Sequence, residues 1–322
     1  MATLVLAADG DAALRDTARM VAAARKLGAP VEVAVLAGDA EAGRALAEAA
    51  ARLAGVEQVW LAADKRLDGL LAEPCAALLY GLAREREYQR IIGAMSAAHR
   101  DVLGRLAGLL DAPALTDVIA IDDARAVQRP MYAGDIVATV GIEAEQAVLL
   151  LRTTAFDEEA EQAQAAAPVA EWPVPEDLPA PVEVLAWEEG AATTAGGDLQ
   201  HARLVLGMGR GAADEETRAL LLQLAQRLGA AVAATRMVVD EGLAPNDWQV
   251  GQTGKRIAPD LYMAFGISGA HQHLAGIADA GMIVAVNNDA EAPIFRAADV
   301  GLVADARVVL QALLERLPEK AG

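Results

Sequence analysis

Residues 204–214 read Leu-Val-Leu-Gly-Met-Gly-Arg-Gly-Ala-Ala-Asp, and this stretch decides the fold of the second half of the chain. A short apolar run, 204–206, passes into a glycine-rich turn, and Asp214 is of a residue type that commonly begins a helix. A helix is expected to follow, because apolar residues between 221 and 228 recur at the spacing of one buried helical face. A strand, a glycine turn and a helix in this order predict one unit of a parallel α/β sheet.

The same alternation of short apolar runs and helical patterns extends through most of the chain. In the second half, strands are expected at 230–235, 261–266, 282–286 and 301–303. In the first half, strands are expected at 4–6, 31–36, 56–62 and 91–92, with helices over 11–27 and 40–54. Strands that alternate with helices predict an α/β protein with two doubly wound, mostly parallel-sheet domains of the Rossmann-like type. In such sheets, ligands bind beyond the carboxyl ends of the strands.

Two segments depart from this alternation. Between about 114 and 152, turns join short strands at 118–119, 137–140 and 148–151, which predicts an antiparallel extension of the first domain. Residues 157–198 hold 11 acidic side chains, five prolines and no Lys or Arg, a composition typical of an extended, solvated linker. One run inside it, 182–187, is a candidate edge strand. The expected division is an N-terminal domain with its linker, 1–198, and a C-terminal domain, 199–322.

The composition argues against several classes of protein. The 322 residues carry 27 basic and 46 acidic side chains, a formal charge of −19, which disfavours broad binding to nucleic acid or to an anionic membrane. Cys75 is the single cysteine, so an internal disulfide is excluded and packing in the core is its expected role. No targeting segment and no apolar run long enough to span a bilayer is visible, so a soluble, intracellular protein is expected.

Charge is unevenly distributed along the chain. Residues 1–200 hold 16 basic and 32 acidic side chains, a net of −16. Residues 201–273 hold seven of each sign, a net of zero. An anionic ligand therefore meets the least repulsion in the stretch 201–273, which also contains the glycine-rich turn.

Several polar groups of that stretch follow expected strands. Gly207, Gly209 and Ala212 match the pattern G-x-G-x-x-A, which indicates either phosphate binding or a tight structural turn. Residues 252–255 (Gln-Thr-Gly-Lys) resemble a phosphate loop but lack its first glycine, so hydrolysis of a nucleoside triphosphate is not supported. Residues 268–273 (Ser-Gly-Ala-His-Gln-His) form a small turn whose hydroxyl and amide groups suit a phosphate or a flavin edge.

Other chemistries find less support. His271 and His273 have no cysteine partner and only two further histidines occur, so a metal site is not expected. Asn287 and Asp305 close two later strands, where such residues are more often turn or cap residues. The acidic residue that would bind a ribose about 20 residues after the glycine turn is missing. No G-x-S-x-G elbow, H-E-x-x-H helix or zinc-spaced pair of cysteines occurs, so the sequence offers no hydrolase or metalloprotease centre.

Longer motifs point to one family. The N-terminal half contains Arg129–Gly134 (RPMYAG) and Arg152–Phe156 (RTTAF). The C-terminal half contains, in order, Gly209–Gly211, Thr235–Arg236, Pro245–Asp247, Val250–Lys255, Pro259–Tyr262, Gly266–Gly276, Asn287–Phe295, Ala298–Asp299 and Gly301–Asp305. In this order, and over essentially the whole chain, the sequence resembles the α subunit of electron-transfer flavoprotein.

The resemblance implies an FAD held mainly by the C-terminal domain. It implies Arg210 near the FAD phosphates and Arg236 against the isoalloxazine, where a guanidinium stabilises anionic reduced flavin and raises the potential for the first electron. It also implies a hydrogen bond from Thr253 near flavin N5 and one from His273 near the O2 edge. The whole implied cofactor-binding set is Arg210, Thr235, Arg236, Val250, Gly251, Gln252, Thr253, Ser268, Gly269, Ala270, His271, Gln272, His273, Asn287, Asp305 and Ala306.

Within that set, Gln252 and residues 268–272 are implied to surround the ribityl chain and the pyrophosphate, while Asn287 and Asp305 hold the adenosine end. Some positions depart from the family pattern. Thr235 stands where the family commonly has Ser, and His271 replaces a commonly aliphatic residue. Met208 replaces a frequent Gly.

The implied function is electron transfer without substrate chemistry of its own. The α subunit pairs with an electron-transfer flavoprotein β subunit that carries AMP or a second FAD, and the N-terminal domain serves as the platform for that subunit. Electrons come from soluble dehydrogenases, such as the acyl-CoA dehydrogenases of fatty acid β-oxidation, and go to a quinone-linked acceptor. The expected location is the bacterial cytoplasm, or the mitochondrial matrix for a mature eukaryotic protein.

Three alternatives stay open from the sequence. The G-x-G-x-x-A turn and Arg236 allow an NAD(P)-dependent oxidoreductase. An electron-bifurcating variant of the same flavoprotein differs mainly in the nucleotide of the β subunit. A nucleotide-binding regulatory or scaffold subunit without a redox role is the third.

Overall fold

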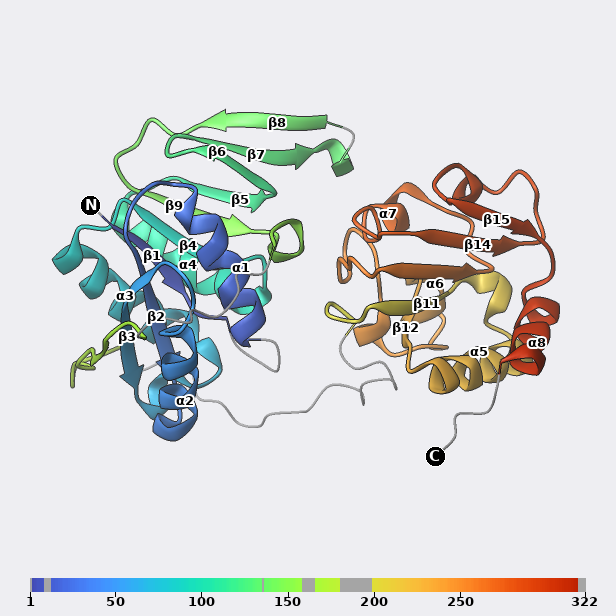
Figure 1. Cartoon of the computed structure of the whole chain (residues 1–322), viewed down its shortest axis with the longest axis horizontal. Coiled ribbons are helices and arrows are strands. Elements are labelled where there is room, and N and C mark those ends of the chain that lie inside the picture. The colour runs from blue at the N-terminus through green and yellow to red at the C-terminus, as the bar shows by residue number, and fades with distance from the viewer. Residues whose placement is uncertain (1, 9–12, 135, 158–165, 180–198, 318–322) are drawn as a thin grey trace. The chain divides into compact units, whose positions relative to one another are not determined.

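The computed structural model describes residues 2–8, 13–134, 136–157, 166–179 and 199–317. The chain divides into two compact units, 1–185 and 186–322, each with its own parallel sheet (Figure 1). The α/β fold with two doubly wound, mostly parallel sheets that the sequence predicts is therefore confirmed.

The first unit is built on a seven-stranded sheet in which every paired strand runs parallel to its neighbour. In spatial order the strands are β10 (Val169–Glu171), β3 (Val56–Ala63), β2 (Val31–Ala37), β1 (Thr3–Leu6), β4 (Arg90–Ala94), β9 (Ala147–Leu151) and β5 (Ala114–Val118). The central strands β1, β4 and β9 are buried along their whole length, as expected for a sheet covered on both faces.

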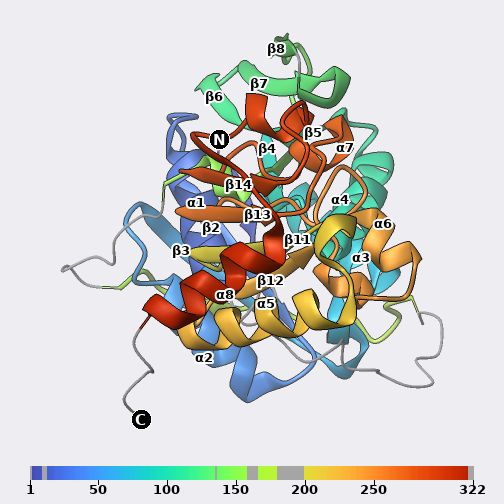
Figure 2. The same cartoon turned by 90° about the vertical axis from the view of Figure 1, so that its right-hand side faces the viewer.

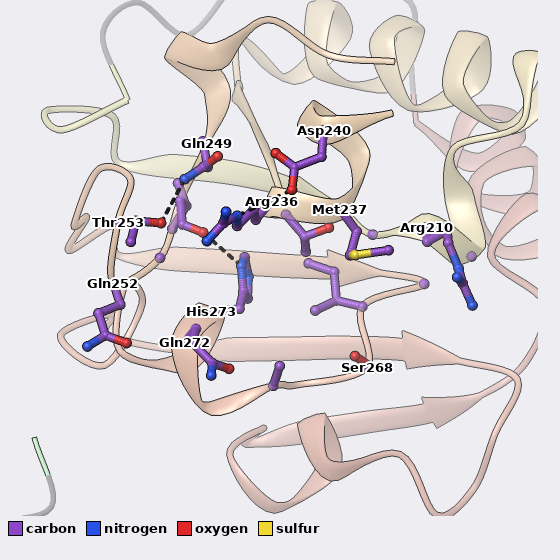
Figure 3. A pocket seen from close by; sticks show the side chains of 18 of the residues that line it. Arg210, Arg236, Met237, Asp240, Gln249, Gln252, Thr253, Ser268, Gln272 and His273 are labelled. Atoms are coloured by element: carbon purple, nitrogen blue, oxygen red, sulfur yellow. Dashed lines mark hydrogen bonds and ion pairs between the residues drawn. The ribbon is translucent and has the colours of Figure 1, made fainter. Parts of the chain in front are cut away.

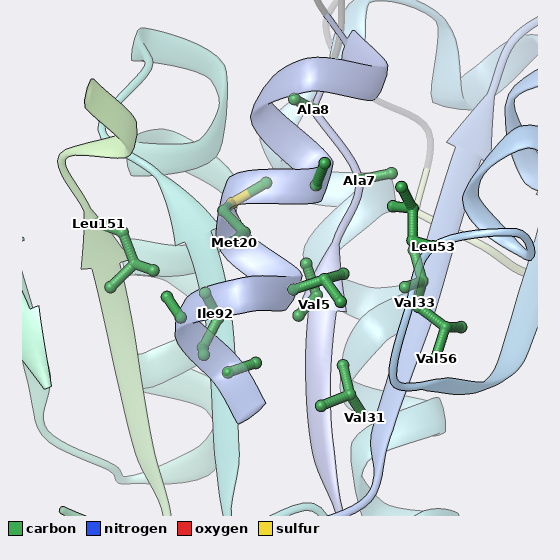
Figure 4. Packing of buried hydrophobic residues seen from close by; sticks show 14 of the residues in the cluster. Val5, Ala7, Ala8, Met20, Val31, Val33, Leu53, Val56, Ile92 and Leu151 are labelled. Atoms are coloured by element: carbon green, nitrogen blue, oxygen red, sulfur yellow. The ribbon is translucent and has the colours of Figure 1, made fainter. Parts of the chain in front are cut away.

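Helices cover both faces of this sheet. One core cluster joins α1 (Ala13–Arg25) and α2 (Ala40–Ala50) to the sheet, and the other joins α3 (Ala72–Arg86) and α4 (Ala97–Leu110) to it. On the first face, Met20 of α1 belongs to one buried cluster with Val5, Ile92 and Leu151 of three adjacent strands (Figure 4). A short 3-10 helix, η1 (Lys65–Leu70), precedes α3.

The antiparallel extension has different boundaries from those predicted. It is a three-stranded sheet of β6 (Ala120–Asp123), β7 (Ala126–Met131) and β8 (Ile136–Gly141), with 3-10 turn η2 (Tyr132–Gly134) between the last two. The prediction that 148–151 belongs to this extension is wrong, because β9 pairs in parallel with both β4 and β5. The prediction is also wrong for Val118, which is the last residue of the parallel strand β5. The unbroken apolar run of β9 is that of a strand buried on both faces.

Part of the acidic segment 157–198 belongs to the sheet of the first unit. After β9 and the short η3 (Thr153–Ala155), β10 adds a parallel edge strand beside β3. The indole of Trp172 packs edge-on against that of Trp60, with ring centroids 5.7 Å apart. Residues 169–172 are thus held on the sheet, and this part of the predicted extended, solvated linker is an edge strand of the first unit. The candidate strand at 182–187 lies outside the described residues.

The second unit is a five-stranded, fully parallel sheet. In spatial order its strands are β12 (Ala231–Ala234), β11 (Leu204–Met208), β13 (Leu261–Phe265), β14 (Ile283–Asn287) and β15 (Val300–Val303). The chain leaves β11 toward one edge of the sheet and returns to build β13 on the other side. The order therefore reverses between β11 and β13, the position where open α/β sheets bind ligands.

The two faces of this second sheet are covered differently. The helices α5 (Glu215–Leu228) and α8 (Ala306–Arg316) lie side by side on one face, with Leu221, Leu224 and Leu310 in the core beneath them (Figure 2). The opposite face is covered by connecting segments that carry Ile257 and Ile277. The short helices of these connections are η4 (Arg210–Ala212), α6 (Arg236–Asp240), η5 (Asn246–Trp248), α7 (His271–Leu274) and η6 (Pro293–Arg296).

The helix predicted after the glycine turn is confirmed. Asp214 is its N-cap, and the carboxylate accepts a hydrogen bond of 3.1 Å from the backbone N–H of Thr217. Gly229 ends the helix in the left-handed conformation that glycine favours. Across the described residues, no helix combines the length and the apolar character needed to cross a membrane.

Candidate functional site

A cavity of about 760 Å³ opens in the second unit at the carboxyl ends of β11, β12 and β13. It lies at the point where the strand order reverses. Its lining residues are Gly209, Arg210, Gly211, Thr235, Arg236, Met237, Asp240, Gln249, Val250, Gly251, Gln252, Thr253, Gly266, Ile267, Ser268, Ala270, Gln272, His273 and Asn287. The volume lies within the range of small-molecule and cofactor sites.

Glycines bring the turns after β11 and β13 into direct backbone contact. The N–H of Gly209 donates to the carbonyl of Phe265 at 2.9 Å, and that of Gly211 donates to the carbonyl of Gly266 at 3.1 Å. A Cβ on Gly209 would lie 2.2 Å from the Gly266 oxygen, so no larger residue fits there without moving the backbone. The glycine pattern therefore builds the floor of the cavity by close packing of two turns.

The helix after the glycine turn does not present a free N-terminus to an anion. The 3-10 turn η4 separates Gly209 from α5, and the carboxylate of Asp214 already caps that helix. Hydrogen bonds from Thr217 lower the pKa of Asp214, so the cap is ionised at neutral pH. Glu215 and Glu216 add two further negative charges in the first turn. Of the two sequence interpretations of G-x-G-x-x-A, the structure favours the tight turn over a pyrophosphate at this helix.

The cavity has a net positive lining in a strongly acidic protein. Arg210 and Arg236 are its two cations and Asp240 is its one carboxylate, a net of +1. No described residue forms an ion pair or hydrogen bond with the side chain of Arg210, which is exposed. Arg210 lies at one end of the group of lining side chains, and Gln252 and Thr253 lie at the other (Figure 3). An elongated anion can therefore meet a free guanidinium at one end of the cavity.

Thr235 and Arg236 reach the cavity because β12 ends beside β11. The N–H of Thr235 donates to the carbonyl of Met208 at 3.0 Å, which extends the parallel pairing by one residue. The chain then turns into α6, whose first residue is Arg236. Thr235 makes no side-chain capping bond to α6, and it lines the cavity.

The segment after α6 returns to the same edge of the sheet. The N–H of Val250 donates to the carbonyl of Ala234 at 3.0 Å, and the N–H of Gln252 donates to that of Gln272 at 2.7 Å. Between these anchors, the side-chain amide of Gln249 donates to Thr253 Oγ1 at 3.1 Å. Because the Thr253 oxygen accepts this bond, its own proton is available to a ligand atom.

His273 is buried in the wall of the cavity, with 6% of its surface exposed. Its Nδ1 lies 3.0 Å from the carbonyl oxygen of Val250 and its Nε2 lies 2.9 Å from Tyr262 Oη. A carbonyl only accepts, so Nδ1 carries the proton and Nε2 accepts from the tyrosine. Burial lowers the pKa of His273 to about 4, which keeps the ring neutral at physiological pH. A hydrogen bond from His273 to a ligand would require the Val250 contact to open.

The other polar residues on this side lie in the turns after β13 and β14. Asn287 donates its side-chain amide to the carbonyl of Ile267 at 2.9 Å, and its Oδ1 accepts from the N–H of Asp289 at 2.9 Å. It thereby ties two cavity-side turns together, as expected of a turn residue. Ser268 is exposed at the cavity, and its backbone carbonyl accepts from Ile294.

Most of the residues carried over from the family come together in this cavity. Twelve of the sixteen line it, and the other four are Gly269, His271, Asp305 and Ala306. Gly269 is buried against Ile294, and the His271 side chain is exposed on α7. Asp305 caps α8, with its carboxylate accepting from Arg307 and Val308, and Ala306 begins that helix. The structure does not bring these four into the lining.

Sequence reasoning did not single out four further lining side chains. They are Met237, Asp240, Gln249 and Ile267. Asp240 follows Arg236 by four residues, a spacing that places both on one helical face and that was available as a signal. The contact between Gln249 and Thr253 has no such signal, because it depends on how an irregular segment folds back.

The lining fits FAD chemically. FAD combines a dianionic pyrophosphate, a hydroxylated chain and a large, flat, mostly apolar ring. Arg210 and Arg236 supply cations, and hydroxyl and amide side chains supply hydrogen bonds. Met237, Val250 and Ile267 supply apolar surface. No group of His, Cys, Asp and Glu that would hold a metal ion occurs in the described part of the chain.

Comparison with known proteins agrees with this site. Residues 198–278 match the model of the electron transfer flavoprotein FAD-binding domain, and residues 3–177 match that of the electron transfer flavoprotein domain. The electron transfer flavoprotein subunit alpha of Paracoccus denitrificans is 46% identical over 98% of this chain and its own full length. That of Pseudomonas aeruginosa is 42% identical, over 95% of this chain and 96% of its own. The mitochondrial subunit alpha of Arabidopsis thaliana is 38% identical, over 99% and 90%.

The matches cover both units, and the FAD-binding match contains every cavity residue except Asn287. The protein belongs to the electron transfer flavoprotein α-subunit family, and FAD is the cofactor of its C-terminal unit.

Proposed function

We propose that this chain carries electrons from soluble dehydrogenases, such as acyl-CoA dehydrogenases, to a quinone-linked acceptor, and has no substrate chemistry of its own. The observation that carries this proposal is the cavity itself, which places two arginines, three hydroxyl groups and four side-chain amides around one elongated space. Among these lining residues we find no nucleophile paired with a general base, so the site is suited to holding a redox cofactor rather than to activating a substrate.

Bound FAD supplies reversible uptake and release of electrons at its isoalloxazine ring. The residues of this chain bind and orient it. Arg210, which is unpaired at one end of the cavity, binds the pyrophosphate. Arg236, in the middle of the group, provides positive charge beside the ring and so favours its reduction.

Hydrogen-bond donors fix the position of the ring. Thr253 offers its hydroxyl proton, because its oxygen is occupied by the amide of Gln249. The peptide segment that carries both residues is held to the sheet by Val250 and to α7 by Gln252. A donor on a segment held in this way would keep a bound flavin ring in one orientation.

In the first unit the strand order reverses between β1 and β4. There the buried ring of His99 bonds to the N–H of Ala94 and the carbonyl of Ala7, and Thr17 bonds to the N–H of Ala8. We propose that this unit serves as the platform for a β subunit, which carries AMP in a simple carrier or a second FAD in a bifurcating one. The complex works in the bacterial cytoplasm or the mitochondrial matrix.

Electron transfer by the reconstituted heterodimer tests the function. The chain is purified with its β subunit, mixed with an acyl-CoA dehydrogenase and its substrate, and followed by the flavin absorbance. We expect bleaching that a quinone analogue reverses. Failure to bleach with several acyl-CoA dehydrogenases, together with rapid bleaching by NADPH alone, would instead support the nicotinamide-dependent alternative.

A further inference from the structure

Asp240 is the one carboxylate among the nineteen lining residues of the cavity, and it faces one of the two cations. Its Oδ2 lies 3.3 Å from Nε of Arg236, one helical turn earlier on α6 (Figure 3). The side chains of Arg236 and Asp240 are 68% and 57% exposed, so neither is needed to fill the protein core. The ion pair therefore lies in the lining of the cavity and not in the buried core.

The contact uses only one edge of the guanidinium. The carboxylate meets Nε, and no described residue bonds to either terminal nitrogen of Arg236. Those nitrogens are therefore free to donate to a ligand in the cavity. At the same time, a carboxylate at this distance cancels part of the positive potential that the arginine produces nearby.

We infer that Asp240 is a positioning residue that acts on the flavin through Arg236. It holds the guanidinium by Nε, and it keeps the potential for the first electron below the value that Arg236 alone would set. This inference rests on the proposed function, in which FAD occupies this cavity. It assigns the tuning of the cofactor to an ion pair within one short helix of this chain.

Neutralising the carboxylate tests the inference. In Asp240→Asn the side-chain oxygen still accepts from Nε, but the negative charge is gone. Glu241→Gln is the matched control, because it removes the same charge from the next residue, which caps α6 and does not line the cavity. The potentials of both variants and the wild-type heterodimer are measured by dye-equilibrated reductive titration at low salt.

We expect Asp240→Asn to favour uptake of the first electron by threefold or more, which corresponds to a rise of about 28 mV. Glu241→Gln should change the equilibrium by less than half as much. The difference in potential between Asp240→Asn and wild type should shrink at high salt, because salt screens an exposed ion pair. No shift or a downward shift in Asp240→Asn, or an equal rise in Glu241→Gln, overturns the inference.

Two further outcomes keep the test decisive. If Asp240→Asn does not retain FAD, the charge-preserving Asp240→Glu carries the test. Its equilibrium constant for uptake of the first electron should stay within twofold of the wild-type value. A larger rise in that constant contradicts the role of the charge. A wild-type heterodimer that binds no FAD refutes the proposed function itself, a result distinct from a flavin whose potential ignores Asp240.

Discussion

Tyr262 Oη donates to His273 Nε2 across 2.9 Å, and the opposite nitrogen of the same ring donates to the carbonyl of Val250. Both side chains are buried, and burial raises the pKa of Tyr262 as it lowers that of His273. This chain of contacts runs from β13 through α7 to the segment that carries Thr253. A buried, neutral histidine thus joins the sheet to the wall of the cofactor cavity.

The first prediction concerns acid stability. The unfolded chain has an ordinary histidine pKa near 6.5, whereas His273 in the folded protein has a pKa of about 4. The unfolded state therefore binds the proton first, so this contribution to stability is complete above pH 6.5 and is lost as the pH falls toward 4. Between pH 6.5 and 5 the loss should be about 1.5 kcal/mol in the free energy of unfolding.

Urea unfolding of His273→Asn at several pH values measures this contribution. The amide nitrogen of asparagine can replace Nδ1, but it does not titrate. We expect a lower stability at neutral pH and a slope against pH that is shallower by about one proton. His271→Asn, which changes an exposed histidine on the same helix, should keep the wild-type slope. Equal slopes in the two variants would mean that His273 is not held neutral by burial.

The second prediction compares the effects of replacing two glycines of one turn, Gly209 and Gly211. A Cβ on Gly209 meets the backbone oxygen of Gly266 at 2.2 Å, whereas a Cβ on Gly211 comes no closer than 3.2 Å to the same residue. Gly209→Ala should therefore lower the free energy of unfolding by about 3 kcal/mol and reduce FAD content, while Gly211→Ala costs about 1 kcal/mol or less. Thermal unfolding and flavin absorbance check both effects. Comparable losses in the two variants would refute the close packing of these turns.

The third prediction concerns the charge beside the flavin. Arg236→Ala removes the cation, so uptake of the first electron should become less favourable by about tenfold, a fall of about 59 mV. Arg236→Lys keeps a point charge but loses the planar fork, and an intermediate potential is expected. Dye-equilibrated titration measures both. An unchanged potential in Arg236→Ala would show that the residue does not face the flavin ring.

The fourth prediction concerns the single thiol. Cys75 is fully buried on α3, and burial raises the pKa of its thiol to about 12. It should resist alkylation in the native protein at pH 8 and react readily in denaturing urea. Mass spectrometry of the peptide that contains Cys75 follows this residue alone. Alkylation within minutes under native conditions would contradict the packing described for α3.

Most of the fold could be predicted from the sequence, because strands and glycine turns are marked by local sequence patterns. The run 204–214 predicts a strand, a tight turn and a capped helix, and the structure has all three. The prediction for 148–151 failed because the turns that precede this run suit an antiparallel extension, whereas its unbroken apolar character suits a buried parallel strand. Five consecutive buried residues at β9 are typical of a central parallel strand, not of a half-exposed antiparallel one.

The sequence motifs mark many of the residues that line the cavity. Other lining residues are brought there only by the tertiary structure, and the sequence did not mark them. Thr235, Arg236 and the segment after Gln249 reach one cavity through backbone pairing that no local pattern reports. Asp305 lies in one of the motifs but does not line the cavity, because its carboxylate caps α8. The ion pair of Asp240 with Arg236 follows from helical spacing, but its place at the cavity follows only from the fold.

Flavin content tests the central claim most directly. The chain is purified together with its β subunit, and the FAD released by heat is quantified per α chain, alongside the AMP. A simple carrier should yield one FAD per α chain and a yellow protein that dithionite bleaches reversibly, with AMP present as well. A colourless heterodimer that stays colourless after incubation with FAD would contradict the assignment of this cavity to the cofactor.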